Sequence, residues 1–201
     1  MNIHITMKNA LLIFIKNPIK GQAKTRLAAT VGDEEALRIY KELLRHTRQI
    51  AQKTTTQRYL FYSHFIDNND EWSNDSFNKK LQIDGDLGQK MAAGFQEAFN
   101  NQLEKVIIIG SDCASLTTDI VENAFKALEK TDFVIGPAED GGYYLLGMRI
   151  FSPSLFENIE WSTPQVFTQT INRIKVLDNT YSLLPTLSDI DYEEDWKKYG
   201  W

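Results

Sequence analysis

The stretch Val106-Ile-Ile-Ile-Gly-Ser-Asp112 places a carboxylate directly after an unbroken apolar run. A short, continuously apolar run is typical of a strand that is buried on both faces of a sheet. Residues 10–15 have the same character. In open sheets of such strands, ligands bind beyond the carboxyl ends of the strands. Asp112 therefore stands where a functional residue is expected.

Outward from this stretch, apolar runs alternate with segments of helical periodicity. Further strands are predicted at residues 58–62, 133–135, 143–148 and 181–184, and helices at residues 34–51, 88–101, 117–130 and 162–175. The polar residues 16–26 are expected to form a loop, and residues 64–80 a loop or a small insertion. This order predicts an α/β protein of three layers with a largely parallel sheet, in one domain over residues 1–201.

The composition excludes several classes of function. The 201 residues are 42% hydrophobic and 24% charged, as in ordinary globular proteins. A net charge of −5 gives no basic surface for nucleic acid. The single cysteine, Cys113, excludes a disulfide framework and a cysteine-based zinc site. Residues 1–8 lack the apolar region of a signal peptide, and residues 10–15 are too short to span a membrane, so we expect a cytoplasmic protein.

The segment after the first strand, Lys16-Asn-Pro-Ile-Lys-Gly-Gln-Ala-Lys-Thr-Arg26, gathers four cations in an otherwise acidic protein. Backbone amides around Gly21, together with Lys24 and Arg26, could hold a diphosphate through charge and paired hydrogen bonds. The segment matches neither the P-loop nor the dinucleotide-binding glycine pattern. A solvated basic loop without function is the alternative interpretation.

Two readings are also open at Asp112. A carboxylate at the end of a strand, followed by small residues and a helix, suits a magnesium ligand that faces a phosphate. Alternatively, Asp112 caps a turn or the helix. Cys113 is expected to be a small buried side chain rather than a nucleophile, because no histidine lies near it in the sequence.

Acidic residues follow two later strands as well. In Gly136-Pro-Ala-Glu-Asp-Gly-Gly-Tyr-Tyr-Leu-Leu-Gly147, the Asp-Gly-Gly turn predicts a hairpin, which leaves Glu139 and Asp140 without a structural reason. The segment Asp189-Ile-Asp-Tyr-Glu-Glu-Asp195 fits either the acidic start of a helix or a late metal ligand. A basic loop with separated carboxylates is suited to holding a nucleotide phosphate through Mg²⁺.

Segments over nearly the whole chain resemble one known superfamily. They are Phe14-Ile-Lys16-x-Pro18 with Gly21, Lys24-Thr-Arg-Leu27, Gly85-Asp-Leu-Gly88 with Met91, Gly110-Ser-Asp-Cys113, Gly136 to Gly147, Trp161-Ser-Thr-Pro164 and Asp189-Ile-Asp191. This pattern resembles the GT-A-fold nucleotide-diphospho-sugar transferases, and within them the bacterial arsenosugar-biosynthesis-type glycosyltransferases, long described as a domain of unknown function. Lys24-Thr-Arg-Leu27 is also similar to the Lys-Ser-Arg-Leu of phospholactate guanylyltransferases. Ala114 stands where the family usually has proline, and Tyr192-Glu193 replaces Thr-Pro in the tail.

The resemblance implies a Rossmann-like GT-A fold with a mixed, mainly parallel sheet that binds a nucleoside phosphate with Mg²⁺ or Mn²⁺. Asp112 and Asp191 match the metal-ligand positions of such folds. The implied phosphate- and nucleotide-binding residues are Lys16, Gly21, Lys24, Arg26 and Ser111. Asp140 is expected to orient or deprotonate the acceptor hydroxyl. The expected substrate pocket contains Gly141, Gly142, Tyr143 and Trp161, although buried packing also accounts for the two aromatic residues.

The leading hypothesis is a metal-dependent enzyme that transfers a glycosyl group from a nucleotide-sugar to a small-molecule acceptor. The first alternative is a nucleotidyltransferase that joins a nucleoside triphosphate to a phosphorylated acceptor and releases pyrophosphate. The absence of a Gly-x-Gly-x-Arg loop after the first strand counts against the sugar-nucleotide-forming kind. The second alternative is a non-catalytic nucleotide-binding protein that kept the fold.

Overall fold

A computed structural model describes residues 8–201 of the chain. The sequence predicts that residues 1–8 are not a signal peptide. Residues 1–7 of this stretch lie outside the described residues. The strands are β1 (Asn9–Ile15), β2 (Gln57–Tyr62), β3 (Asn78–Leu81), β4 (Lys105–Ile109), β5 (Phe133–Pro137), β6 (Tyr143–Met148) and β7 (Tyr181–Leu183). The helices are α1 (Thr25–Val31), α2 (Asp33–Lys53), α3 (Leu87–Asn100), α4 (Thr118–Ala127), α5 (Val166–Val176) and α6 (Glu193–Tyr199), with a short 3₁₀ helix at Pro153–Phe156.

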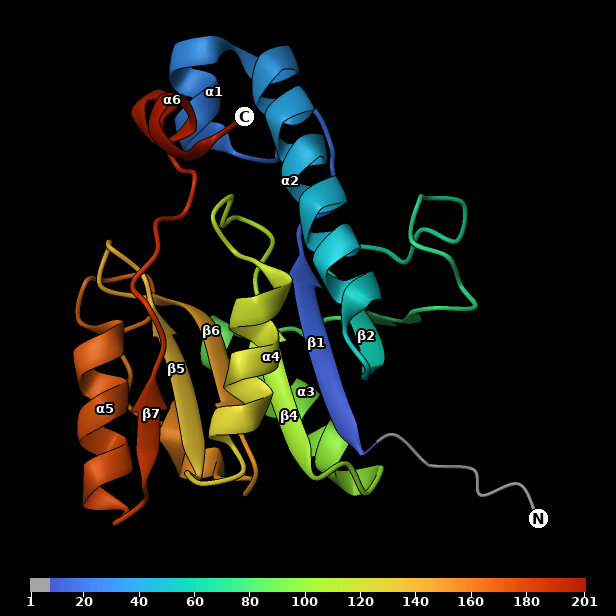
Figure 1. The fold of residues 1–201 in the computed structure, drawn as a ribbon. Coiled ribbons are helices and arrows are strands. Elements are labelled where there is room, and N and C mark those ends of the chain that lie inside the picture. The colour runs from blue at the N-terminus through green and yellow to red at the C-terminus, as the bar shows by residue number, and fades with distance from the viewer. Residues whose placement is uncertain (1–7) are drawn as a thin grey trace.

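The strands form one seven-stranded sheet in the order β3-β2-β1-β4-β6-β5-β7 (Figure 1). β6 is antiparallel to β4 and β5, and the other neighbouring strands pair in parallel. The predicted hairpin is therefore the β5–β6 unit, and it inserts one reversed strand into the sheet. This arrangement confirms the expected mixed, mainly parallel α/β fold.

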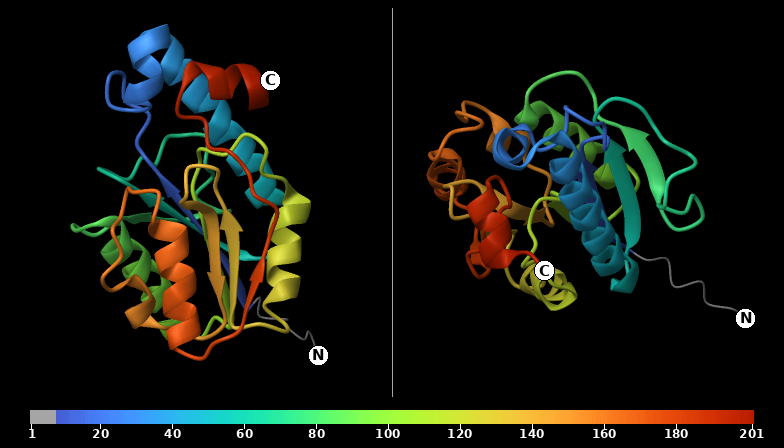
Figure 2. Two further views of the ribbon diagram at one scale, coloured as in Figure 1. Left: turned by 90° about the vertical axis from the view of Figure 1, so that its left-hand side faces the viewer. Right: turned by 90° about the horizontal axis from the view of Figure 1, so that it is seen from above.

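The core lies on both faces of the sheet because alternate strand residues point to opposite sides. Leu11 and Ile13 of β1 pack against α2 and α4, whereas Ala10 and Leu12 pack against α3 and α5. The sheet consequently lies between two helical layers, which the side view in Figure 2 shows. Burial of one aliphatic side chain contributes about 1.5–3 kcal/mol, so the continuous apolar runs are what hold the layers together.

Helix α1, strand β3 and the short 3₁₀ helix at Pro153–Phe156 were not predicted from the sequence. Residues 25–31 form α1, although the basic segment before them was expected to be a loop as far as Arg26. Only Leu27 of α1 is fully buried, so its helical periodicity is weak. The edge strand β3, Asn78-Lys-Lys-Leu81, has no buried residue and hence no apolar signal. Helix α5 begins at Val166, later than the expected start at residue 162.

Helices α1 and α6 stand beyond the carboxyl edge of the sheet (Figures 1 and 2). The C-terminal Trp201 contacts Trp196 of α6 and the imidazole of His46 in α2, with ring centroids 5.7 and 4.7 Å apart. The Nε2–H of His46 donates to the carbonyl of Leu116 at 2.8 Å. The C-terminus is thereby attached to α2.

Acid should loosen this attachment. Burial lowers the pKa of His46, and the nearby positive charges of Arg45 and Lys53 lower it as well. The hydrogen bond to Leu116 raises this pKa, but its effect is smaller than that of burial. The unfolded chain therefore takes up the proton more readily, so the free energy of unfolding should fall as the pH drops below about 6.5. Urea unfolding at about pH 7.5 and 5.5 should give a smaller loss for His46→Gln than for the wild type. Equal losses in the two proteins would contradict this role of His46.

Candidate functional site

The predicted site residues lie at the ends of four strands. Lys16 follows β1, Asp112 follows β4, Asp140 follows β5, and Asp191 lies in the segment after β7. This last segment crosses the sheet edge. Leu187 pairs with the end of β5, and the Ile190 N–H donates to the Asp112 carbonyl at 2.9 Å. Residues from both halves of the chain thus meet at the carboxyl edge.

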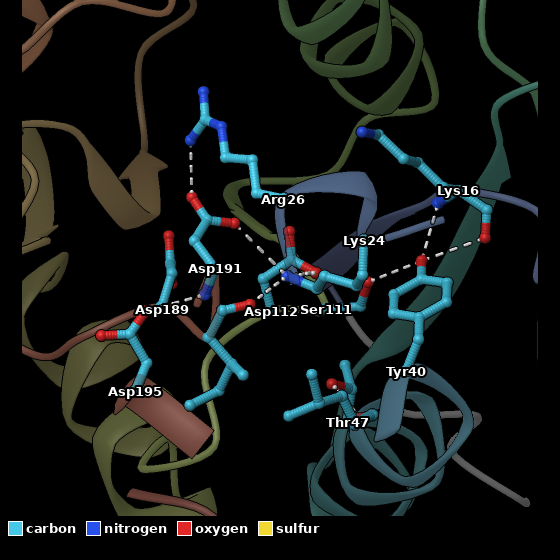
Figure 3. A network of polar contacts seen from close by, with 12 residues as sticks. Lys16, Lys24, Arg26, Tyr40, Thr47, Ser111, Asp112, Asp189, Asp191 and Asp195 are labelled. Carbon is cyan, nitrogen blue, oxygen red and sulfur yellow. Dashed lines mark hydrogen bonds and ion pairs between the residues drawn. The ribbon is translucent and has the colours of Figure 1, made fainter. Parts of the chain in front are cut away.

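The side chain of Lys24 lies at the centre of this meeting point (Figure 3). Its Nζ donates to the Ile190 carbonyl at 2.7 Å, and it forms ion pairs with Asp112 Oδ1 at 2.9 Å and Asp191 Oδ1 at 3.7 Å. Only 6% of the side chain is exposed. Lys24 therefore contacts the two predicted metal ligands, and its predicted role in phosphate binding stays a prediction.

Arg26 and Asp195 hold the other side of Asp191. Arg26 Nη1 donates to Asp191 Oδ2 at 2.9 Å, while 62% of the Arg26 side chain remains exposed. Asp195 Oδ2 accepts from the N–H groups of Asp191 and Tyr192 at 3.0 and 2.8 Å. The acidic tail starts a helix, since α6 begins at Glu193 with Glu193, Glu194 and Asp195 in its first turn. The alternative, that this segment supplies a metal ligand, stays a prediction.

Asp189 is a candidate residue that the sequence analysis did not select. Burial raises the pKa of its carboxyl to about 7, and the charge of Asp112 acts in the same direction while Lys24 opposes it. Asp189 lines both of the cavities described below. The sequence feature that could have identified Asp189 is its position two residues before the predicted metal ligand Asp191.

Tyr40 of α2 orders the start of the basic segment. Its hydroxyl accepts from the Lys16 N–H at 2.9 Å, donates to the Lys16 carbonyl at 3.0 Å and lies 3.2 Å from Ser111 Oγ. Burial, together with the charge of Asp112, raises the pKa of this phenol far above its usual range. Tyr40 thus ties the ends of β1 and β4 together as a neutral hydroxyl, and Ser111 is one of its partners.

Most cations of the basic segment have acidic partners. Lys20 pairs with Glu34, Lys24 with Asp112, and Arg26 with Asp191. Within residues 8–201, Lys16 is the cation of this segment that forms no ion pair. Gly21 lines neither cavity at the edge and has φ +75°, which indicates a turn.

Two cavities adjoin at the carboxyl edge. The β1–β4 cavity, of about 400 Å³, is lined by Lys16, Ser111 and Asp112 among others. The β5–α5 cavity, of about 470 Å³, is lined by Arg26, Asp140, Gly142 and Trp161 among others. They share Leu87, Tyr143, Ser162 and Asp189. Both volumes lie in the range of small-molecule sites, and the shared lining residues place the two cavities side by side.

The β5–α5 cavity is shaped by two close approaches of the chain. Asp140 Oδ1 accepts from the Gly142 N–H at 2.8 Å, which closes the turn. Gly141 has φ +87°, and because it carries no side chain, the backbone of Pro164 can pack directly against the turn. Trp161 packs on Gly88 in the first turn of α3. The aromatic residue is thus half-buried and still lines the cavity.

Cys113 and Tyr143 offer no reactive group. Burial raises the pKa of the Cys113 thiol to about 12, as its predicted role as a buried small residue requires. The Tyr143 ring lines both cavities, but its hydroxyl points to the sulfur of Met91 at 3.9 Å.

The middle of the chain matches one known protein family. Residues 46–163 match the family described as "Uncharacterized protein conserved in bacteria (DUF2064)". This match covers more than half of the chain. The chain belongs to this family. A search of curated proteins finds no significant match.

Solved structures extend the comparison. A protein from Desulfovibrio desulfuricans G20, provisionally named a nucleotide-diphospho-sugar transferase, matches with a TM-score of 0.86 and 28% identity over 93% of this chain and 84% of its own. The inositol-1-phosphate CTP transferase from T. maritima matches with a TM-score of 0.62 and 15% identity over 96% and 94% of the two chains. A CMP:2-keto-3-deoxy-manno-octonic acid synthetase in complex with CTP has a TM-score of 0.57 and 9% identity over 94% and 96%.

These matches confirm the resemblance and the Rossmann-like fold predicted from the sequence. The relative from D. desulfuricans, at 28% identity, is named as a transferase, which supports the expected enzyme class. The two distant matches show the fold alone. Among the helices of residues 8–201, none combines the length and the apolar character that crossing a membrane requires.

The Gly141 turn allows a direct test of the cavity's construction. In Gly141→Ala the new Cβ would clash with the carbonyl oxygen of Pro164, and alanine would have to adopt φ +87°. We expect a loss of about 2 kcal/mol or more in the free energy of unfolding, measured by urea denaturation.

Gly110→Ala is the matched control, because nothing lies within 4 Å of its Cβ position and its φ is not positive. Its stability should stay within about 0.5 kcal/mol of the wild type. Similar stabilities for the two variants would show that the turn tolerates a side chain.

Proposed function

We propose that this protein transfers a glycosyl group from a nucleotide-diphospho-sugar to a small acceptor, with the help of a divalent cation. The observation that carries this proposal is the pair of adjoining cavities, which share Tyr143, Ser162 and Asp189 at the carboxyl edge. A transfer reaction needs two substrates in contact, and proximity alone supplies a large part of the rate enhancement. The name of the relative from D. desulfuricans supports the choice of donor.

The β1–β4 cavity is the proposed site of the nucleotide. It contains Lys16, whose ammonium forms no ion pair with the described residues and is available for a phosphate. Gly110 leaves the cavity floor open. Arg26 lines the second cavity and keeps most of its guanidinium exposed, so it could contact phosphate from that side.

The β5–α5 cavity is the proposed site of the acceptor. Trp161 gives it an apolar wall, and Asp140 supplies a carboxylate at the opposite turn. Asp140 is exposed, and its Oδ1 is held by the Gly142 N–H. In the proposed reaction Asp140 accepts a hydrogen bond from the acceptor hydroxyl and withdraws its proton during the attack on the sugar.

The proposed cation is Mg²⁺ or Mn²⁺, held by Asp112 and Asp191. Carboxylate oxygens are the ligands that these ions prefer, and Mg²⁺ is commonly bound by one or two carboxylates together with substrate phosphates. Within residues 8–201, no three acidic, histidine or cysteine side chains are gathered closely enough to hold a metal ion without such help. The two carboxylates fit an ion that arrives with a nucleotide. When bound, it would neutralise the diphosphate leaving group.

A nucleotidyltransferase is the second candidate. The T. maritima CTP transferase and the synthetase in complex with CTP share the fold, and Lys24-Thr-Arg-Leu27 resembles the guanylyltransferase segment. In that reaction, a phosphorylated acceptor would attack the nucleoside triphosphate and release pyrophosphate. Pyrophosphate formation in the presence of candidate acceptors separates this reaction from glycosyl transfer.

Thermal unfolding with nucleotides is the first experiment. The ligands are nucleoside di- and triphosphates and UDP-, GDP- and ADP-sugars, each with and without Mg²⁺ or Mn²⁺. A ligand at 100 times its dissociation constant should add about 2.7 kcal/mol, which raises the midpoint by about 5–10 °C for a chain of this size. A larger shift with a nucleotide-sugar favours glycosyl transfer, and a larger shift with a triphosphate favours nucleotidyl transfer. No shift with any ligand would contradict both reactions.

Asp112→Asn should abolish the metal-dependent part of this shift, because an amide is a much weaker ligand for a hard cation than a carboxylate. Asp75→Asn is the control, since Asp75 is exposed in the loop before β3 and lines neither cavity at the edge. An undiminished shift in Asp112→Asn would remove Asp112 from the proposed metal site.

A further inference from the structure

The ammonium of Lys24 lies between the two carboxylates to which the proposed function assigns a cation. It contacts Asp112 Oδ1 at 2.9 Å and lies 3.7 Å from Asp191 Oδ1 (Figure 3). The Ile190 carbonyl accepts a third contact at 2.7 Å. Its polar partners are therefore one hydrogen-bond acceptor, the Ile190 carbonyl, and two ion-pair partners, Asp112 and Asp191. The group is thus satisfied within the protein.

The surroundings of Lys24 hold the ammonium in this place. The side chain is 94% buried, and a buried ammonium that lost its partners would carry a large desolvation penalty. The backbone of Lys24 has φ 52°, a left-handed conformation that is unusual for lysine and directs the chain into α1. Its surroundings differ from those of Lys16, whose side chain is exposed and forms no ion pair with the described residues.

We propose that Lys24 is a built-in counter-ion of the metal site, which competes with a free divalent cation for Asp112 and Asp191. This inference rests on the proposed function, because it takes the two carboxylates as the ligands of the ion. Two positive groups cannot share the same carboxylate oxygens without strong repulsion. The chain alone should therefore bind a divalent cation weakly, and the ammonium has to leave before the ion binds tightly.

The charge balance of the site supports this competition. Lys24 pairs with both Asp112 and Asp191, and Arg26 pairs with Asp191 alone. Arg26 is largely exposed, so its charge is screened by water. Without the Lys24 ammonium, the carboxylates would repel one another and attract any available cation.

The test measures Mn²⁺ binding to the whole chain without nucleotide, from the loss of the electron paramagnetic resonance signal of free Mn²⁺. Lys24→Met keeps the apolar stem and removes the charge. We expect it to bind Mn²⁺ about tenfold more tightly than the wild type, because the competing charge is gone. Adding Asp112→Asn to Lys24→Met should remove this gain, which locates the ion at the same site.

Lys20→Met is the matched control. It removes one positive charge from the same basic segment, but Lys20 is exposed and pairs with Glu34. Its effect on Mn²⁺ affinity should be less than about threefold, since water and salt screen an exposed charge. Lys24→Arg keeps the charge and should bind Mn²⁺ as weakly as the wild type.

A second measurement covers the case in which Lys24→Met is too unstable for titration. Its unfolding midpoint should be lower than that of the wild type without metal and should rise by several degrees with Mn²⁺, whereas the wild-type midpoint should not move with Mn²⁺ alone. The counter-ion role is overturned if Lys24→Met does not bind Mn²⁺ more tightly than the wild type and is not stabilised by Mn²⁺. The metal-dependent nucleotide shift of the wild type is a separate result, so it shows whether the proposed function falls as well.

Discussion

The buried contact of the Lys24 ammonium with Asp112 and Ile190 is the interaction on which the arrangement of the site depends. It joins the start of α1, the end of β4 and the segment after β7. A charge buried in this way is stabilising only while its partners remain in place, so each of the three segments fixes the other two. The position of Asp191, and through it of α6, follows from this contact.

The reversed strand β6 has an equal influence on what the edge can do. Because β6 runs against its neighbours, its first residue, Tyr143, lies at the edge where the parallel strands end. The hairpin before it brings Asp140 and Gly142 to the same place. The reversed strand therefore adds side chains to the carboxyl edge of the sheet, where two cavities adjoin. Tyr143 and Asp189 line both of these cavities.

The sequence predicts the sheet and its layers well because buried strands and amphipathic helices carry strong apolar patterns. It fails where burial is slight, as in α1, in which only Leu27 is fully buried, and in β3, which has no buried residue. The strand-end residues could also be predicted to share one edge. Their mutual contacts could not, since the turn of Lys24 toward Asp112 depends on a left-handed backbone and on a segment 166 residues away. For the same reason Asp189 was overlooked beside Asp191, because the two carboxylates differ in environment and not in local sequence.

The sequence separation of this contact also bears on how the protein matures. Lys24 and Ile190 lie 166 residues apart, so their meeting closes nearly the whole chain into a loop. Contacts of such separation form late, after local helices and neighbouring strands. During synthesis from the N-terminus, Ile190 must emerge from the ribosome before Lys24 can find its partner. A partly made chain can therefore build most of the sheet, but its carboxyl edge remains without an assembled centre until the segment around Ile190 has been made.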